Sequence, residues 1–210
     1  MRRQYRKSFA MTDMDYKHLI KKGATGAPLL VTLHGTGGDE NQFFTFASQL
    51  RPDATILSPR GDVSEHGAAR FFRRTGEGVY DMADLARGTQ KLGHFVRKTA
   101  ETVGASEIFG LGFSNGANIL ANVLVEFPDL LDRAALLHPL IAFQPKPAQG
   151  LAGRRILVTA GERDPICPTP LTIALADYFT AQGATTQLAW HNGGHDIREN
   201  EIEAMRTLFA

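Results

Sequence analysis

The strongest constraint on the fold of this chain is a serine enclosed by glycines between an apolar run and a helical pattern. Residues 112–116 read Gly-Phe-Ser-Asn-Gly, which has the form G-x-S-x-G. The apolar residues 107–111 before the motif predict a buried strand, and residues 117–127 after it repeat apolar side chains at helical spacing up to Pro128. A strand, a tight turn carrying a serine and a helix together predict a nucleophile elbow, whose strained turn needs small neighbours. The alternative is a serine in an ordinary glycine-rich turn.

A serine hydroxyl is a weak nucleophile until a neighbouring base takes its proton, and a third group must orient that base. In chains with such an elbow, the acid and then the histidine follow the serine. Asp164 follows an apolar strand predicted over residues 155–160, and His195 follows an alternating strand predicted over residues 185–190. Both residues therefore come at the carboxyl ends of strands, where the sites of open α/β sheets form. The sequence predicts a catalytic triad of Ser114, His195 and Asp164.

Other residues compete for the roles of base and acid. Glu162 lies in the same loop but closer to the strand, and Asp164 before a proline could be a plain turn residue. His191 lies at the strand end, where its ring would point into packing or solvent, whereas His195 has a flexible Gly-Gly loop before it. The capping-box spacing of residues 196–199 predicts the start of the last helix directly afterwards. Structural or solvated roles are expected for the histidines that lack a partner pattern, which are His18, His66, His94 and His138.

The fourth part of the predicted site is a pair of backbone N–H groups that would stabilise a negatively charged oxygen. An apolar strand over residues 28–33 is followed by His-Gly-Thr-Gly-Gly at residues 34–38, and residues 39–42 have the spacing of a helix start. We expect one donor from the backbone of Thr36 and the other from Asn115, directly after the serine. The alternative is a phosphate-binding loop, but the Gly-Lys-Ser/Thr ending and the GxGxxG spacing of such loops are missing.

These motifs occur in one fixed order, and together they resemble the carboxylesterase/phospholipase group of the α/β-hydrolases, which also contains the acyl-protein thioesterases. The resemblance extends from about Asp15 onward and is carried by residues 33–40, 58–61, 110–116, 161–166 and 193–195. It implies an α/β-hydrolase fold with a mostly parallel central sheet, helices on both faces and no large cap domain. It also implies hydrolysis of small carboxylic esters through an acyl-enzyme. Acyl-protein thioesterases usually carry Gln or His where this chain has Asn115, which counts against deacylation of proteins.

Two loops, residues 61–79 and 140–152, are the segments that could wall the substrate pocket. Phe71 and Phe72 are apolar residues in the first loop, so one ring could line an acyl or aromatic pocket, or both could anchor the loop to the core. Cys167 is expected to be a small packed residue. Because no segment is left for a large lid, short acyl chains should be preferred. The arginines of the first loop are expected to form a solvated loop face, and the alternative is that they bind an acidic group of the substrate. They are Arg70, Arg73 and Arg74.

Composition agrees with a single α/β-hydrolase domain over residues 15–210, preceded by a tail over residues 1–14. The net charge of +1 gives no reason to expect nucleic acid or an anionic membrane as a partner, and no apolar run is long enough to span a membrane. One cysteine excludes an intrachain disulfide, which fits the cytoplasm, and residues 1–7 lack the apolar core of a signal peptide.

The expected partner is a small-molecule ester, and the chain could form a homodimer. Because the triad supplies its own nucleophile and the histidines lack ligand spacing such as H-E-x-x-H, no metal or organic cofactor is expected. The remaining alternatives are an acyl-thioesterase or lysophospholipase of the same family, a cofactor-free perhydrolase, and a hydrolase-fold binding protein without turnover.

Overall fold

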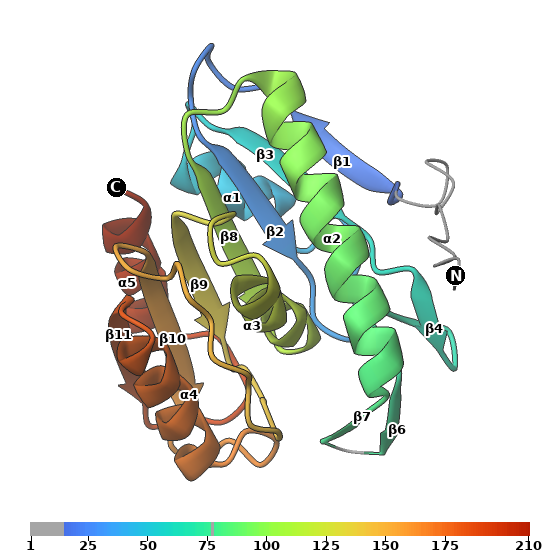
Figure 1. Ribbon diagram of the computed structural model, residues 1–210, viewed down its shortest axis with the longest axis vertical. Helices are drawn as coiled ribbons and strands as arrows, with labels where there is room; N and C mark the ends of the chain where they lie inside the picture. The colour runs from blue at the N-terminus through green and yellow to red at the C-terminus, as the bar shows by residue number, and fades with distance from the viewer. Residues whose placement is uncertain (1–14, 77) are drawn as a thin grey trace, which may run out of the picture.

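The computed structural model describes residues 15–76 and 78–210, so the predicted tail over residues 1–14 lies outside the described part of the chain. A seven-stranded sheet runs through the middle of the molecule in the order β1-β3-β2-β8-β9-β10-β11 (Figure 1). Only the edge strand β1 is antiparallel to its neighbour, and every other pair is parallel. The strands are β1 (His18–Lys21), β2 (Leu29–Leu33), β3 (Thr55–Pro59), β8 (Ile108–Phe113), β9 (Arg133–Leu137), β10 (Arg155–Gly161) and β11 (Thr185–His191).

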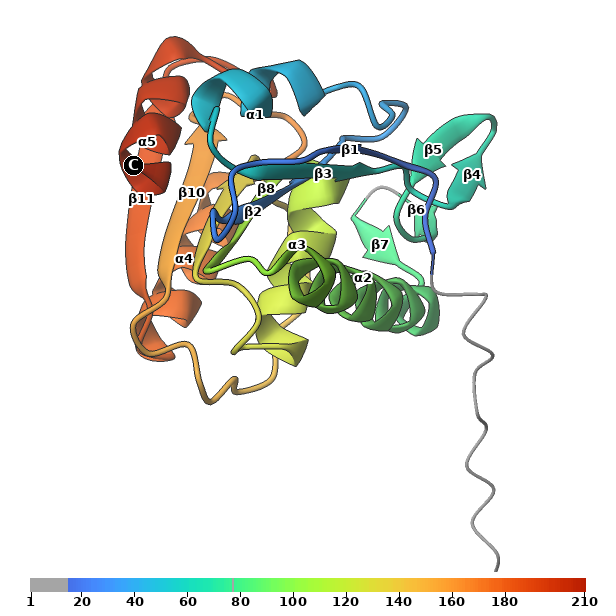
Figure 2. The same cartoon turned by 90° about the horizontal axis from the view of Figure 1, so that it is seen from above.

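Helices cover both faces of this sheet, as predicted (Figure 2). Two of them pack on one face, namely α1 (Phe44–Leu50) and α5 (Glu199–Phe209). The other face carries α2 (Met82–Val103), α3 (Asn115–Glu126) and α4 (Thr169–Ala181). Two apolar cores result, one on each face, and the strands between them are buried from both sides. This explains why the predicted strands read as almost continuous apolar runs, since a parallel sheet has no solvated face.

The loop between β3 and α2 contains structure that the sequence did not reveal. It forms two small hairpins, the first from β4 (Val63–Glu65) and β5 (Ala68–Arg70), the second from β6 (Arg74–Gly76) and β7 (Val79–Tyr80). Both lie at the end of the sheet where β2 and β3 finish (Figure 2). The hairpins therefore bring this loop to the carboxyl ends of the strands, where it can wall a pocket.

Two predicted helix starts were wrong. Asp39 accepts the N–H of Asn41 within a turn, so α1 begins later, at Phe44. At the last helix, Asp196 accepts the N–H of Gly194, and α5 begins at Glu199. In both cases the aspartate binds a neighbouring backbone group of its own loop, a local bond that competes with helix capping. Among the described residues, no helix has the length and apolar character needed to cross a bilayer.

Candidate active site

Ser114 lies in the turn between β8 and α3 and has a strained backbone. Its φ of 52° and ψ of −117° fall outside the regions that residues with a side chain normally adopt. The turn leaves no room beside it, because a Cβ atom on Gly112 would lie 2.5 Å from the carbonyl oxygen of Gly116. A Cβ atom on Gly116 would lie 2.4 Å from the carbonyl oxygen of Leu33 in β2. The glycines of the motif thus allow the turn to pack against the sheet, as the elbow interpretation requires.

Asp164 and His195 meet beside this serine. The Nδ1 atom of His195 lies 2.7 Å from Oδ2 of Asp164, while the other carboxylate oxygen accepts the N–H groups of Ile166 and Cys167 at 2.8 and 3.1 Å. Burial raises the pKa of Asp164, but its hydrogen bonds to histidine side chains and to these N–H groups outweigh burial and leave the pKa below its usual value. The carboxylate is therefore ionised near neutral pH and accepts a hydrogen bond from the N–H group at Nδ1 of His195.

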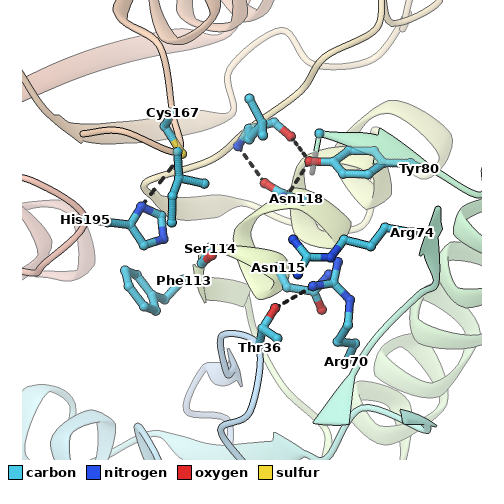
Figure 3. A pocket seen from close by; sticks show the side chains of 13 residues that line it. Thr36, Arg70, Arg74, Tyr80, Phe113, Ser114, Asn115, Asn118, Cys167 and His195 are labelled. Atoms are coloured by element: carbon cyan, nitrogen blue, oxygen red, sulfur yellow. Dashed lines mark hydrogen bonds between the residues drawn. The ribbon is translucent and has the colours of Figure 1, made fainter. Parts of the chain in front are cut away.

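The second nitrogen of the His195 ring, Nε2, takes no part in the contact with Asp164. Its Nε2 atom is buried and has no hydrogen-bond partner among the described residues. His195 and Ser114 line the same cavity, and Figure 3 shows Ser114 between His195 and Asn115. With the Nδ1 proton held by Asp164, a neutral His195 keeps the lone pair of Nε2 available to take a proton.

The competing residues do not reach this position. Glu162 is exposed, and its backbone N–H donates to the carbonyl oxygen of His191. The ring of His191 is buried, with Nδ1 accepting the N–H of Gly193 at 2.9 Å and Nε2 lying 3.4 Å from Glu201. The structure thus brings together Ser114, His195 and Asp164, and leaves Glu162 and His191 outside the cavity.

The two backbone donors predicted for an oxyanion hole flank the serine. Thr36 and Asn115 both line the cavity. As the first residue of α3, Asn115 has a backbone N–H without a partner inside the helix. The end of the first hairpin and the residue after it hold both residues in place. Arg70 donates to the hydroxyl of Thr36 at 2.6 Å, and the N–H of Phe71 donates to the side-chain oxygen of Asn115 at 2.9 Å. The loop around Thr36 is therefore rigidly placed beside the elbow.

Phe71 and Phe72 are core residues and do not line the cavity. Both side chains are fully buried. The ring of Phe71 packs 4.7 Å from the ring of His34, and the ring of Phe72 packs 5.0 Å from that of Tyr80. Of the two roles considered for these residues, the structure shows the anchoring of the loop to the core. The sequence could not distinguish them, because both residues lie in the short connection between β5 and β6, where no periodic pattern shows which side faces the core.

The neighbouring arginines differ in their surroundings. Arg70 is only 3% exposed and lines the cavity together with Arg74. Glu65 lies 2.9 Å from Arg74 and 3.5 Å from Arg70. By contrast, the side chain of Arg73 is 62% exposed, and it pairs with Asp81 and with the buried Asp84, each at 3.3 Å. The solvated role expected for all three holds only for Arg73, so the cavity has a polar, cationic wall opposite His195 (Figure 3).

The cavity is small, with a volume of about 270 Å³. Tyr80 forms part of its wall, donating its hydroxyl proton to the carbonyl oxygen of Leu140 and accepting from Asn118 at 2.9 Å. Cys167 is 1% exposed, and its sulfur lies 3.9 Å from Nδ1 of His195. Both predicted wall loops, residues 61–79 and 140–152, supply residues that line the cavity. A second hollow of about 600 Å³ lies between residues 141–145 and α4, and its lining contains none of the residues of the candidate site.

Within residues 15–76 and 78–210, two triplets of side chains place ligand-type atoms within 4.8 Å of one another. They are His138 with Asp164 and His195, and His138 with His191 and Glu201. In the second triplet the N–H of Gly193 donates to Nδ1 of His191, so the neutral ring carries its proton on Nε2, the atom that would have to bind a metal. In the first, the histidine nitrogens that face Asp164 are held in hydrogen bonds with its carboxylate. We interpret both triplets as hydrogen-bond networks.

Comparison with known proteins shows the family to which this chain belongs. Residues 73–201 match the dienelactone hydrolase family. The chain belongs to that family. It is also 37% identical over 195 residues to MhqD of Bacillus subtilis, a protein provisionally assigned as a hydrolase, and the match covers 92% of this chain and 97% of MhqD. This family membership makes the protein a hydrolase.

Solved structures agree. The protein Atu2452 of Agrobacterium tumefaciens, whose function is unknown, is 61% identical with a TM-score of 0.90, over 94% of this chain and 97% of that one. A carboxylesterase of Bacillus cereus is 34% identical with a TM-score of 0.88, over 94% and 95% of the two chains. The α/β-hydrolase fold and the resemblance to carboxylesterases are thereby confirmed.

Proposed function

We propose that this member of the dienelactone hydrolase family is a serine carboxylesterase that cleaves small carboxylic esters through an acyl-enzyme. One observation carries the proposal: the unpartnered Nε2 of His195 shares a cavity with the strained Ser114, while Nδ1 of the same ring is held by Asp164. A serine in an elbow, a base with a free lone pair and an ionised acid are the parts that nucleophilic catalysis of acyl transfer requires.

The reaction follows from these positions. His195 takes the proton of the Ser114 hydroxyl as its oxygen attacks the ester carbonyl, and Asp164 stabilises the imidazolium that forms. His195 then donates that proton to the departing alcohol, which leaves an acyl group on the serine. A water molecule enters, loses a proton to the same nitrogen and attacks the acyl-enzyme, releasing the carboxylic acid and restoring the serine.

The tetrahedral intermediates carry a negative oxygen, which the backbone N–H groups of Thr36 and Asn115 would stabilise. Removal of one such donor typically costs about 2.7–4 kcal/mol of transition-state stabilisation. Side-chain substitution cannot remove a backbone N–H, but the clamp of Arg70 on the hydroxyl of Thr36 can be released. Thr36→Val would keep the shape of the side chain and lose this bond.

The cavity suggests a small substrate with a polar end. A volume of about 270 Å³ lies below the range of about 300–1,000 Å³ for pockets that take drug-sized ligands, so it suits a short acyl group and a small alcohol. The guanidinium groups of Arg70 and Arg74 on the wall opposite His195 favour an ester that carries an anionic or strongly polar group.

A fluorophosphonate probe tests the serine mechanism directly, since it reacts covalently with an activated serine. The wild-type protein should be labelled at Ser114 and should hydrolyse p-nitrophenyl acetate. Ser114→Ala should lose both, whereas Ser106→Ala, which alters an exposed serine, should lose neither. Hydrolysis by clean Ser114→Ala at a tenth of the wild-type rate would exclude Ser114 as the nucleophile, and a protein that neither labels nor turns over would be a binding protein.

A panel of substrates separates the alternatives within the enzyme class. Matched oxygen esters and thioesters of one acyl group distinguish an esterase from a thioesterase. Halogenation in the presence of acetate, bromide and peroxide would identify a perhydrolase that uses the same three residues. We expect oxygen esters with short acyl groups to give the highest kcat/KM.

A further inference from the structure

We propose that His138 is a positively charged positioning residue for the triad, held between Asp164 and Glu201, and that it sets the pH range in which His195 can act as a base. The inference rests on the proposed function, because it concerns the base of that mechanism. It assigns a role to a buried histidine and a buried glutamate that the triad itself does not use.

His138 lies directly behind the triad acid. It follows β9, the strand between β8 and β10 (Figure 1). Its side chain is 0% exposed, and so are those of Asp164 and Glu201. The Nδ1 atom of His138 lies 2.9 Å from Oδ2 of Asp164, and its Nε2 atom lies 3.1 Å from Oε1 of Glu201. The backbone of His138 has a φ of 51°, an unusual conformation that places the ring in this gap.

The hydrogen-bond donors around Asp164 determine that Nδ1 of His138 carries a proton. One carboxylate oxygen accepts the N–H groups of Ile166 and Cys167, and the other lies within hydrogen-bond distance of both His195 and His138. An ionised carboxylate has no proton to donate, so each ring must present an N–H to it. His138 therefore carries a proton on Nδ1.

The hydrogen-bond donors around Glu201 determine that Nε2 of His138 also carries a proton. The N–H of Arg198 donates to Oε2 at 2.6 Å, and the hydroxyl of Thr159 donates to Oε1. His191 keeps its proton on Nε2, as the bond from Gly193 requires, and this atom lies 3.4 Å from Oε2 of Glu201 and 3.4 Å from Nε2 of His138. Nε2 of His138 itself lies closer to Glu201, at 3.1 Å from Oε1. With donors on both oxygens, Glu201 is held as a carboxylate, and the Nε2 atom of His138 must donate to it.

The energetics agree with a charged ring. Burial lowers the pKa of His138, but the hydrogen bonds and charges of Glu201 and Asp164 outweigh burial and leave the pKa above its ordinary value. Burial raises the pKa of Glu201, and its hydrogen bonds to His138, Thr159 and Arg198 reverse the shift and leave the pKa low. A buried carboxylate–imidazolium–carboxylate chain is stable only when complete, because removing one member leaves an uncompensated buried charge.

The charged ring of His138 lies close enough to His195 to act on it electrostatically. The rings of His138 and His195 lie 5.1 Å apart, whereas Glu201 lies on the far side of His138. The other titratable groups that face His138 are Asp164 and His191, with the Cys167 thiol on its backbone oxygen at 3.2 Å. A positive charge at this distance opposes a second positive charge on His195, so the neutral, proton-accepting form of His195 is favoured.

His138→Asn is the sharpest perturbation. The asparagine amide can still donate to Asp164, but it carries no charge and does not reach Glu201, which then takes up a proton. The field at His195 becomes more negative, because the lost cation is nearer than the lost anion. We expect the acid limb of kcat/KM against pH to move up by about one pH unit, which lowers the rate about ten-fold at any pH below both midpoints.

His191→Asn is the matched control. It removes a buried histidine of the same network that contacts Glu201 and the Nε2 atom of His138, each at 3.4 Å, and not Asp164. It should lower the melting temperature and leave the acid limb in place. Both variants and the wild type should be compared by p-nitrophenyl acetate hydrolysis and by the pH dependence of fluorophosphonate labelling. A purely structural role of His138 would lower the rates of His138→Asn equally at all pH values.

A second measurement needs no variant. In uniformly ¹⁵N-labelled wild-type protein, both ring nitrogens of His138 should show the chemical shifts of protonated imidazole at pH 7. An unprotonated Nε2 at that pH, or an unmoved acid limb in folded His138→Asn, overturns the inference. Failure of the proposed function looks different, since wild-type Ser114 would then remain unlabelled at every pH.

Discussion

Asp164→Asn tests the triad more sharply than an alanine substitution, because the surrounding donors dictate how the amide must sit. One oxygen of Asp164 accepts the N–H groups of Ile166 and Cys167. Asparagine has a single oxygen, and these two backbone donors retain it there. The NH₂ group of the amide must therefore face the Nδ1 atoms of His195 and His138, where the second carboxylate oxygen lies in the wild type.

The consequence for His195 is the wrong tautomer. A neutral ring that accepts a hydrogen bond at Nδ1 carries its proton on Nε2, and Nε2 is the atom available to Ser114. It can no longer take the serine proton. Conversion of a triad acid to its amide lowers turnover by about 10⁴-fold. Since each factor of ten corresponds to about 1.36 kcal/mol, the loss is about 5.4 kcal/mol of transition-state stabilisation.

The assay is steady-state hydrolysis of p-nitrophenyl acetate by Asp164→Asn, with the melting temperature measured on the same sample. Glu162→Gln is the matched control, because Glu162 is exposed, and it should stay within a few-fold of the wild type. If Asp164→Asn keeps more than about a hundredth of wild-type turnover while Glu162→Gln is severely impaired, the acid has been misassigned. The role of Ser114 would survive that result.

The other expectations concern the base, the pocket and stability. His195→Ala should lose nearly all kcat/KM, whereas His191→Ala should mainly lower the melting temperature; the reverse pattern would refute the assignment. Acetyl and butyryl esters should be better substrates than palmitoyl esters, and a preference for palmitoyl would reveal a larger binding site. Arg74→Gln should raise KM for an ester with a free carboxylate several-fold, while the exposed Arg73→Gln should not. Because the pKa of folded His138 is raised, the stability from its charge is complete below the unfolded value of about 6.5. It is lost as pH rises through the folded pKa, so thermal denaturation from pH 6 to 9 should show a fall in melting temperature that His138→Asn flattens.

The sequence predicted the positions of those candidate residues that have a local signature. Ser114 lies in a turn where any residue larger than glycine at positions 112 and 116 would clash with the backbone. Asp164 and His195 each follow a predicted strand. In a parallel sheet, the residues after successive strands gather at one edge, so three positions distant in the chain could be predicted to meet. The contact between Asp164 and His195 was predictable from chain order and strand polarity alone.

The first wall loop was not predictable in the same way. Phe71 and Arg70 are neighbours in the chain, yet one packs into the core and the other reaches the cavity. Arg70 is the last residue of the three-residue strand β5 and Phe71 follows it directly. A strand this short leaves no periodic pattern in the sequence. The same limit explains the helix starts, since Asp39 and Asp196 have the spacing of caps but bind loop N–H groups.

His138 shows where a signal was present and was not used. It stands directly after an apolar strand, as Asp164 does, and that strand lies between the nucleophile strand β8 and the acid strand β10. A polar residue at the carboxyl end of the intervening strand must lie between the serine and the loop of the acid. Its partner Glu201 comes from α5, where a fully buried glutamate has a cost that only paired donors can offset. The helical pattern could have raised that question, because the glutamate stands with Met205 and Leu208 on the buried face of the last helix. A histidine after the middle strand and a glutamate on a buried helical face are, together, a sequence pattern that indicates a charged network behind a catalytic acid.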